Sequence, residues 1–399
     1  MLKVLKFGGS SMADAKQFEK VKSIVQADPS RKVVIVSAAG KRFSDDHKLT
    51  DLLYLCHAHL NYGVSCSDIF NTIEQRLTEI RDELGLSYDV ETELKELERT
   101  LSKDTPVDLL VSRGEYFTSR LMAEYLGYTF VDAADCVIFS FDGSIDYERS
   151  YALIAEAAEK YGRIVIPGFY GRVSTGKIKV MTRGGSDITG SLAAVAVNAD
   201  VYENWTDVSG ILMADPRIVD NPEPIKKITY AELRELAFMG ATVLHEESVQ
   251  PVREKGIPLN IRNTNRPQDP GTMIVGNIDR ENSDDRFITG IAGRKNFTII
   301  TLQKHDMHTS HTLRQALEVF ERYHAPIEHI ALGLDSFALV TSSAGLGESI
   351  YQLMGDLQKA CHPDDISQQD DIALVAAVGR KMPFRPGTSG KLFKALGDA

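Results

Sequence analysis

A lysine, two glycines and two serines near the start of the chain have the types and order of a phosphate-binding turn. Segment 6–11 has the sequence KFGGSS and follows a short apolar run at 2–7 that predicts a β-strand. Glycines allow backbone N–H groups to approach phosphate oxygens, and a helix beginning near Ala13 would add the positive end of its dipole. Lys6 would supply a mobile positive charge to a phosphoryl group in transit. The alternative is a Gly-Gly turn with a structural role only.

A second segment, MTRGGSD at 181–187, precedes a run of small residues that predicts a helix. The planar guanidinium of Arg183 suits a carboxylate, and the two glycines after it permit a close approach. Ser186 or Asp187 would cap the helix. Capping accounts for the serine and the aspartate but not for an arginine beside two glycines, so the segment indicates a functional site.

Two further segments carry polar side chains at positions suited to binding. Segment 204–217, NWTDVSGILMADPR, places polar residues at the end of a predicted strand, where nucleotides bind at the open edge of α/β sheets, although a plain turn fits equally well. Segment 112–115, SRGE, is expected to open a helix. Its Glu115 either holds a substrate ammonium group or only interacts with the positive end of the helix.

Two patterns resemble sites but fail on their context. GRVSTGK at 171–177 matches a P-loop until Ile178, where a Ser or Thr should bind magnesium, and the alternation after it predicts a strand in place of a helix. His305, His308 and His311 lack a nearby cysteine or carboxylate pattern, which favours a surface location over a metal site.

The elements that would position these motifs follow from the hydrophobic pattern. Short apolar runs alternate with amphipathic segments, which predicts β/α units on a mostly parallel sheet. Strands are expected at 2–7, 32–37 and 163–167. Between the last two, apolar residues at helical spacing from 68 to 103 predict an inserted pair of helices with a solvated charged face.

A turn-rich, polar segment at 270–285 indicates a domain boundary. The pattern beyond it predicts a βαββαβ unit: a strand at 297–303, a helix at 312–323, strands at 326–333 and 336–341, a helix at 348–360 and a weak strand near Ile366. A second copy would begin with a strand at 371–378 and a helix at 389–396 and is incomplete. The expected domains are therefore 1–280, 295–368 and an unfinished unit at 369–399.

Composition narrows the function classes. The 399 residues are 43% hydrophobic and 25% charged, as in soluble globular proteins, and 45 basic against 56 acidic residues give a net charge of −11, which disfavours nucleic acid or anionic membrane as a partner. Four cysteines without a C-x-x-C pair disfavour structural zinc and suit a reducing cytoplasm. Neither a membrane span nor a signal peptide is expected.

Taken in chain order, these segments resemble the motifs of the aspartate kinases of the amino acid kinase family. The matching segments are KFGGSS, SAAGK with Leu49-Thr50-Asp51, SRGEYF, PGFYG, TRGGSD, WTDVSGI, ADPR, GATVLH and PGT, across residues 3 to 275. The tail resembles the family's paired ACT regulatory modules. The resemblance implies an αβα sandwich with a mostly parallel central sheet, followed by ACT-like units of which the second is incomplete.

The implied reaction transfers the γ-phosphoryl group of ATP to the side-chain carboxylate of L-aspartate, the first step toward lysine, threonine and methionine. The acceptor is already ionised at neutral pH, so no strong general base is required and catalysis would rest on alignment and charge neutralisation, with Mg²⁺ on the β and γ oxygens. The resemblance implies a homodimer or higher homo-oligomer with lysine or threonine as a possible effector, and inhibition by either is expected to be weak or absent because the second ACT-like unit is incomplete. The alternatives are a catalytically silent amino-acid sensor and a kinase for another amino acid such as glutamate.

The resemblance assigns roles residue by residue. The catalytic residues would be Lys6, Arg183 and Asp187. ATP would be held by Lys6, Phe7, Gly8, Gly9, Ser10, Ser37, Thr206, Asp207, Leu212, Asp215 and Arg217. Aspartate would be held by Thr50, Glu115, Phe169, Arg183, Gly184, Gly185 and Ser186. The effector would bind within segment 304–312, through Met307 and Ser310, facing Gly333, Asp335 and Ser336. No protein ligand for a metal is assigned. Ile211 and Thr242 depart from the family's usual residues, an aromatic residue at the first position and Lys or Glu at the second.

Overall fold

The computed structural model describes residues 1–182, 184–240, 244, 246–278, 288–305, 309–380, 382 and 386–398. The chain divides into two compact units. The first contains residues 1–237, 242–290 and 379–399, and the second contains residues 238–241 and 291–378. Three residues named above, Arg183, Thr242 and Met307, lie outside the described residues.

An eight-stranded, mostly parallel sheet forms the centre of the first unit, in the order β3-β5-β2-β1-β8-β10-β11-β9. Only the pairing of β10 with β11 is antiparallel. Residues 33–36 in β2 are fully buried, as expected for a parallel strand covered on both faces. The strands are β1 (Lys3–Phe7), β2 (Arg31–Val36), β3 (Thr129–Phe130), β5 (Ile164–Pro167), β8 (Val201–Thr206), β9 (Lys227–Thr229), β10 (Leu259–Asn263) and β11 (Thr272–Val275).

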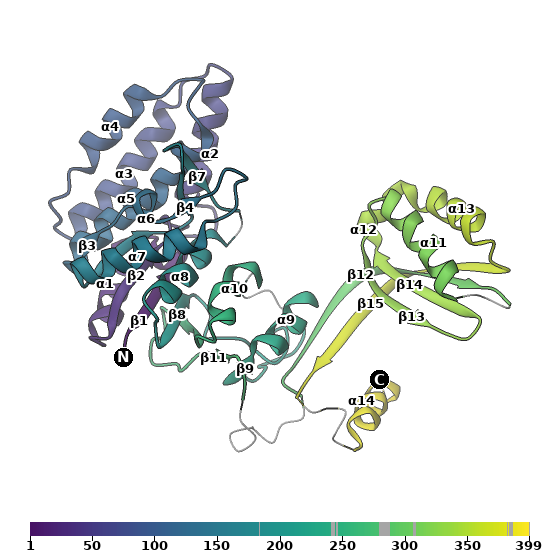
Figure 1. The fold of residues 1–399 in the computed structure, drawn as a ribbon. Helices are drawn as coiled ribbons and strands as arrows, with labels where there is room; N and C mark the ends of the chain where they lie inside the picture. Colours follow the sequence, from purple (N-terminus) through teal and green to yellow (C-terminus); the bar gives the residue numbers. More distant parts are fainter. Residues whose placement is uncertain are drawn as a thin grey trace. The chain divides into compact units, whose positions relative to one another are not determined.

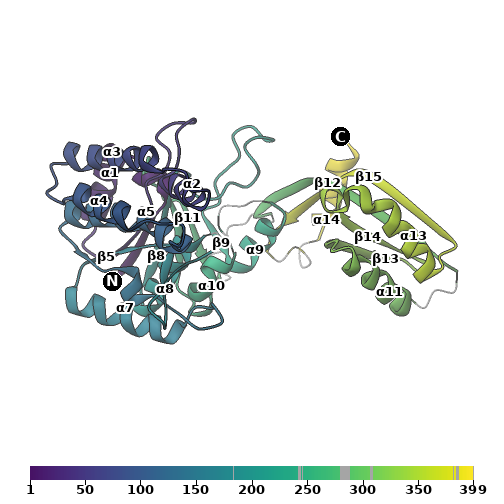
Figure 2. The same ribbon diagram turned by 90° about the horizontal axis from the view of Figure 1, so that it is seen from above.

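Helices cover both faces of this sheet, so the predicted αβα sandwich is confirmed (Figures 1 and 2). One face carries α1 (Ala15–Gln26), α2 (Leu49–Asn61), α3 (Ser67–Glu83), α4 (Val90–Thr100) and α5 (Val107–Leu126). The other carries α7 (Tyr147–Tyr161), α8 (Gly185–Ala196) and α10 (Glu246–Glu254). Shorter elements are the 3₁₀ turn η1 (Gly9–Met12), α6 (Ala133–Cys136), α9 (Tyr230–Phe238) and a small sheet of β4 (Ile138–Phe139), β6 (Tyr170–Val173) and β7 (Ile178–Val180).

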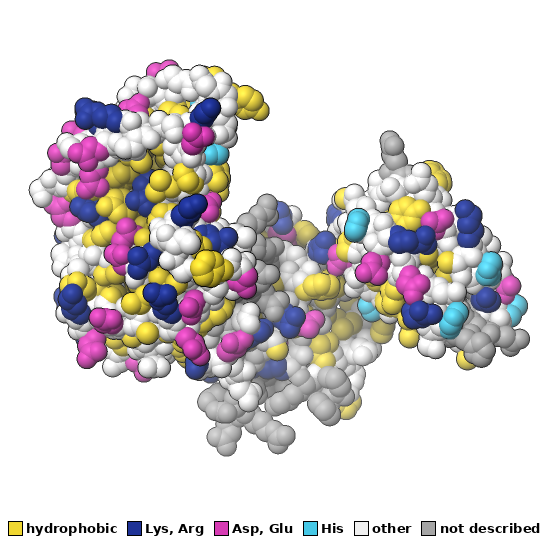
Figure 3. Space-filling view, turned by 45° about the horizontal axis from the view of Figure 1, so that its top comes forward, with side chains coloured by type: hydrophobic (Ala, Val, Ile, Leu, Met, Phe, Trp, Pro, Cys, Tyr) yellow, Lys and Arg dark blue, Asp and Glu magenta, His cyan; other side chains and the backbone are white. Residues whose placement is uncertain are grey.

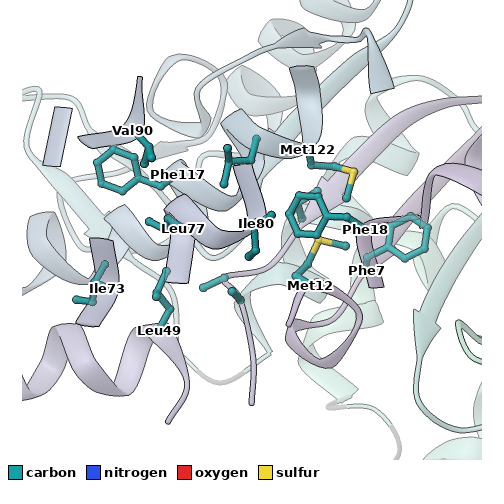
Figure 4. Close-up of a cluster of buried hydrophobic side chains, with 14 of the residues drawn as sticks. Phe7, Met12, Phe18, Leu49, Ile73, Leu77, Ile80, Val90, Phe117 and Met122 are labelled. Atoms are coloured by element: carbon teal, nitrogen blue, oxygen red, sulfur yellow. The ribbon is translucent and has the colours of Figure 1, made fainter. Parts of the chain in front are cut away.

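The helical insertion belongs to the main hydrophobic core. Ile73, Leu77 and Ile80 of α3 are buried beside Phe117 of α5, in the same cluster as Phe7 of β1 (Figure 4). Each fully buried aliphatic or aromatic side chain of this size contributes roughly 1.5–3 kcal/mol. The outer faces of α3 and α4 are solvated, so the predicted pair of amphipathic helices is confirmed and packs on the core of the first unit.

A buried carboxylate joins four neighbouring strands. Glu203 of β8 is 2% exposed and accepts two hydrogen bonds from Arg31 of β2, at 2.9 and 3.1 Å. The ammonium of Lys3 lies 3.4 Å from the same carboxylate, the guanidinium of Arg262 lies 4.0 Å away, and the indole N–H of Trp205 donates to it at 3.0 Å. Three cations therefore share one carboxylate in the interior, which fixes the register of β1, β2, β8 and β10.

The second unit has the predicted βαββαβ order around an antiparallel sheet arranged β13-β14-β12-β15. Buried side chains of α11 and α13 pack on one face of this sheet and form the core of the unit. Its elements are β12 (Gly290–Gln303), α11 (Thr309–Arg322), β13 (Ile327–Leu332), β14 (Ser336–Ser342), α12 (Ser343–Leu346), η3 (Gly347–Ser349), α13 (Ile350–Cys361) and β15 (Asp365–Val378).

The end of the chain differs from the expected element pattern. One strand near Ile366 and another at 371–378 were expected, whereas β15 runs without interruption from Asp365 to Val378 at the edge of the sheet, beside β12. Asp371 has a φ of 58°, which marks a local kink within the strand. The first half of β15 is polar and shows no alternation of apolar residues, so the hydrophobic pattern does not predict it as a strand. It is extended because it pairs with β12. The last helix, α14 (Thr388–Gly397), groups with the first unit, and the domain boundaries expected at 280, 295 and 368 stay predictions.

The surface carries charges of both signs, and the cysteines are unpaired. On the face shown in Figure 3, basic and acidic side chains are interspersed over both units. All four cysteines are free and buried. No helix in the described part of the chain is long and apolar enough to cross a membrane.

Candidate functional site

The glycine turn after β1 lies at the carboxyl end of the sheet. Its Gly8 N–H donates to the carbonyl of Trp205 at 3.1 Å, and Gly9 accepts from the N–H of Gly40 at 2.8 Å. A Cβ on Gly40 would lie 2.5 Å from the carbonyl carbon of Gly9, so these two backbones touch. A 3₁₀ turn, η1, follows before α1 begins at Ala15, two residues later than expected. A Cβ on Gly8 would lie 3.8 Å from the Lys6 ammonium, so the turn begins beside the lysine of β1.

Lys6, Asp187 and Asn204 form an interacting cluster drawn from three elements. The Lys6 ammonium lies 2.6 Å from the Asp187 carboxylate, which also accepts from the side-chain amide of Asn204 at 2.9 Å. Lys6 and Asn204 are paired across β1 and β8, and Asp187 lies in the first turn of α8. The predicted catalytic residues Lys6 and Asp187 are thus brought together. Asn204 was not predicted as a site residue, although its place in the NWTD run was the available signal.

The predicted nucleotide residues divide into two groups. Ser37 follows β2 and donates its N–H to Phe7 at 3.2 Å, and Thr206 ends β8, so both stand at the edge that carries the glycine turn. The Thr206 hydroxyl donates to the exposed Asp207 carboxylate at 3.2 Å. Ser10 is exposed in η1. Four predicted residues of this group therefore line one open edge of the sheet.

The other nucleotide residues lie on the loop after Gly210, which has a φ of 98° and packs on Thr272. Leu212 bridges to Pro224 within this loop. Asp215 and Arg217 pair with each other, at 2.6 Å for the closest contact, and Arg217 is 85% exposed. The hydrogen bond from Arg217 lowers the pKa of Asp215 to about 2. Each of these two side chains is therefore a partner of the other.

Glu115 is a buried carboxylate without a full set of partners. It lies on α5, is 5% exposed, and its Oε2 atom has no hydrogen-bond partner in the described part of the chain. Burial raises its pKa to about 8, partly offset by hydrogen bonds from the backbone of Ala38 and of Glu115 itself. A Cβ on the adjacent Gly114 would lie 3.0 Å from Ala38 and 3.5 Å from Thr50, so the predicted Thr50 is close by. A cation would satisfy this carboxylate.

The segment after β5 packs tightly on the start of α8. Phe169 has a φ of 76°, an uncommon conformation for a side chain of its size, and its N–H donates to the Thr189 hydroxyl at 3.2 Å. A Cβ on Gly168 would lie 2.6 Å from the Ser186 side chain, and one on Gly185 would lie 2.8 Å from Phe169. The predicted residues Phe169, Gly185 and Ser186 are therefore neighbours, and Gly184 caps α8 at a φ of 76°. The strained phenylalanine marks this turn as a candidate substrate contact.

The fold decides one of the two rejected patterns, the P-loop match. Segment 171–177 forms the end of β6 and the turn into antiparallel β7, and no helix follows, which confirms that it is not a P-loop. His305 donates its N–H to Asp364 at 2.7 Å, and His308 lies outside the described residues. Where side chains are described, no group of three His, Cys, Asp or Glu residues is placed to hold a metal ion.

The predicted effector segment lies beside the β13–β14 turn. Lys304 donates its N–H to the Asp335 carbonyl at 2.9 Å, and Gly333 donates to the Ser336 carbonyl at 2.8 Å. Ser310 is exposed in the first turn of α11. The two sides of the expected pocket are therefore adjacent at Lys304.

The chain is similar to known proteins over most or all of its length. The model of the amino acid kinase family matches residues 1–263. Aspartokinase 3 of Bacillus subtilis is 33% identical and covers 100% of this chain and 90% of its own length. The crystal structure of Clostridium acetobutylicum aspartate kinase has a TM-score of 0.91 at 45% identity, over 100% of this chain and 91% of that chain.

Two crystal structures of Escherichia coli aspartokinase III are also similar. The complex with aspartate and ADP has a TM-score of 0.74 at 25% identity, over 99% of this chain and 91% of that chain. The complex with lysine and aspartate has a TM-score of 0.72 at 26% identity, over 95% and 87%. Because the family model matches residues 1–263 and the B. subtilis aspartokinase is 33% identical over the whole chain, the chain belongs to the amino acid kinase family and, within it, to the aspartokinases.

Proposed function

We propose that the Lys6–Asp187–Asn204 cluster is the centre at which this chain transfers the γ-phosphoryl group of ATP to the side-chain carboxylate of L-aspartate, giving 4-phospho-L-aspartate. The observation that carries the proposal is the placement of a buried ammonium beside the glycine turn, 2.6 Å from Asp187. The likeness to an aspartokinase structure with bound aspartate and ADP supports the same substrates.

Charge and position supply the chemistry. The aspartate side chain is ionised at neutral pH, so it attacks without a general base. Lys6 is held by Asp187 and would offer its charge to the oxygens that gain negative charge in the transition state. Asn204 holds Asp187 in turn, so that the ammonium is oriented before substrate arrives. The main-chain N–H groups of Gly9 and Ser10 would bind the phosphates.

Mg²⁺ would bind at this site together with the nucleotide, held mainly by its phosphates. Mg²⁺ keeps several waters and is usually held by one or two carboxylates together with substrate phosphates. The described residues hold no ready-made group of three acidic or histidine ligands, which suits that mode of binding. Asp207, exposed at the end of β8, is the carboxylate at the open edge that would approach it. The ion would neutralise charge on the β and γ oxygens.

Aspartate would bind between α5, the turn after β5 and the start of α8. Glu115 would accept the substrate ammonium, because a cation compensates a buried carboxylate whose Oε2 atom lacks a hydrogen-bond partner among the described residues. Phe169 and Ser186 would contact the substrate, and Thr50 lies on the neighbouring helix. Arg183, whose guanidinium suits a carboxylate, remains assigned by its sequence position.

A coupled assay of ADP release tests the reaction. Aspartate with Mg²⁺ should give turnover, whereas glutamate, other amino acids and nucleoside monophosphates should give little, and chelation of Mg²⁺ should abolish the signal. Glutamate as the far better acceptor would assign the chain to another kinase. Binding of amino acids without any turnover would support a silent sensor.

A homo-oligomer controlled by an end product is the regulatory part of the proposal. Lysine or threonine would bind near Lys304 and Asp335, where the predicted effector segment meets the β13–β14 turn. The relative from E. coli crystallised with lysine supports lysine as the first ligand to test. Inhibition of ADP release by lysine that is absent with arginine and is weakened by Asp335→Ala would support this proposal. Equal inhibition by lysine, threonine and arginine would contradict it.

A further inference from the structure

The segment between β2 and α2 touches the phosphate turn directly. Gly40 donates its N–H to Gly9 at 2.8 Å, and the two backbones leave no room for a side chain at Gly40. At its other end the segment joins α2, where Leu49 donates to the Ala39 carbonyl at 3.0 Å. A movement of Gly40 would therefore displace the backbone that is to bind phosphate.

One side chain from the helical insertion joins both ends of this segment. Arg76 of α3 is 3% exposed; its Nη2 donates to the Gly40 carbonyl at 2.6 Å and its Nη1 donates to the His47 carbonyl. Asp46 lies 3.7 Å away and balances the charge, and Arg42 holds Asp46 at 2.9 Å. A planar guanidinium can bridge two carbonyls in fixed geometry, whereas an ammonium cannot. The contact at the Gly40 carbonyl leads directly to Gly9 of the phosphate turn, because Gly40 donates its own N–H to Gly9.

We propose that Arg76 is a positioning residue for phosphoryl transfer: it fixes segment 40–47, and through Gly40 the phosphate turn at Gly9, from a helix that contributes no residue to the proposed substrate contacts. The inference rests on the proposed function. Through Arg76, the helical insertion takes part in catalysis, although the sequence predicts for it only a pair of helices with a solvated face. The effect should fall on the chemical step, because misplacement of a phosphate-binding backbone by about 1 Å can cost about 100-fold in rate.

The test compares Arg76→Ala and Arg76→Lys with Arg81→Ala, a matched control on the same helix whose guanidinium pairs at the surface with Asp82 and Glu91. Arg76→Ala should lower kcat about 100-fold and change the KM for aspartate less than about threefold. Guanidinium chloride at millimolar concentration should restore kcat at least about tenfold in Arg76→Ala, whereas sodium chloride should not. Arg81→Ala should keep wild-type kinetics.

Each outcome decides the question. A folded Arg76→Ala with wild-type kcat, or with a loss that guanidinium does not restore, would assign Arg76 to structure alone and overturn the inference. If Arg76→Ala does not fold, Arg76→Lys decides, because it keeps the charge and the aliphatic stem: a lowered kcat supports positioning and an unchanged kcat overturns it. A wild-type chain that does not phosphorylate aspartate would overturn the proposed function itself, and this inference with it.

Discussion

Protonation of Glu115 should control the binding of aspartate near neutral pH. Burial raises the pKa of Glu115 to about 8, so the carboxyl group is protonated for most of the time at pH 7 in the free protein. A substrate ammonium requires the ionised form. Binding of aspartate should therefore release a proton, and the cost of removing it should appear in the KM for aspartate.

The magnitude follows from that pKa. With a value of about 8, the protonated fraction multiplies KM by roughly 2 at pH 8, roughly 11 at pH 7 and roughly 100 at pH 6. The KM for aspartate should thus rise roughly 50-fold between pH 8 and pH 6, a loss of about 2.3 kcal/mol of binding free energy. At pH 7 close to one proton should be released for each aspartate bound.

Coupled assays from pH 6 to pH 9 would measure this dependence, and calorimetry in two buffers of different ionisation enthalpy would count the protons. Glu115→Gln is the matched control: its KM should be high and independent of pH over this range. A KM for aspartate that stays flat between pH 6 and pH 8 in the wild-type chain would refute the link between the buried carboxylate and the substrate ammonium.

Folding favours the protonated form of Glu115, whereas the binding of aspartate requires the ionised form. An unfolded chain ionises Glu115 near pH 4.5 and the folded chain near pH 8, so folding retains a proton between these values and stability falls as pH rises through that window. Glu115→Gln removes the burial cost and should raise the free energy of unfolding at pH 8 by about 1–3 kcal/mol, measured by urea titration. A variant less stable than the wild type at pH 8 would contradict this.

Three further substitutions test other parts of the structure. Lys6→Met should lower kcat by about 10³-fold with little change in the KM for aspartate, because the ammonium stabilises the transition state; near-normal turnover would remove Lys6 from the catalytic centre. Glu203→Gln should lower the free energy of unfolding by about 3–5 kcal/mol in urea titrations, because Arg31 and its neighbouring cations lose their shared carboxylate; a loss below about 1 kcal/mol would show that those cations are compensated by other groups. Gly168→Ala should lower kcat/KM for aspartate by about tenfold or more, because its methyl group would displace Ser186; unchanged kinetics would exclude Ser186 from the substrate site.

Local sequence determined the parts of the site that depend on residue type and on the neighbouring element. Lys6 at the end of a strand, the glycines after it and Asp187 at the start of a helix were predicted from short segments, because strand periodicity, glycine freedom and helix capping act within a few residues. Strands β1, β2 and β5 of the parallel sheet and the βαββαβ unit followed from the same short-range patterns, whereas the number and order of the eight strands came from the structure. Glu115 was recognised as a candidate from its sequence position. Its burial and the missing hydrogen-bond partner of its Oε2 atom were not predicted.

Tertiary structure decided which distant groups meet. Asn204 contacts Asp187 because the first turn of α8 lies beside β8, and the parallel pairing of β1 with β8 brings Lys6 to the same point. Arg76 donates to the Gly40 carbonyl although the two residues are far apart in the sequence. The hydrophobic pattern predicts only that Arg76 lies on an amphipathic helix. Likewise β15 is continuous because it pairs with β12, although its polar residues carry no apolar alternation. Burial, strand pairing and the pKa of Glu115 are properties of the packed chain, since each depends on groups that come together only when the sheet and its helices assemble.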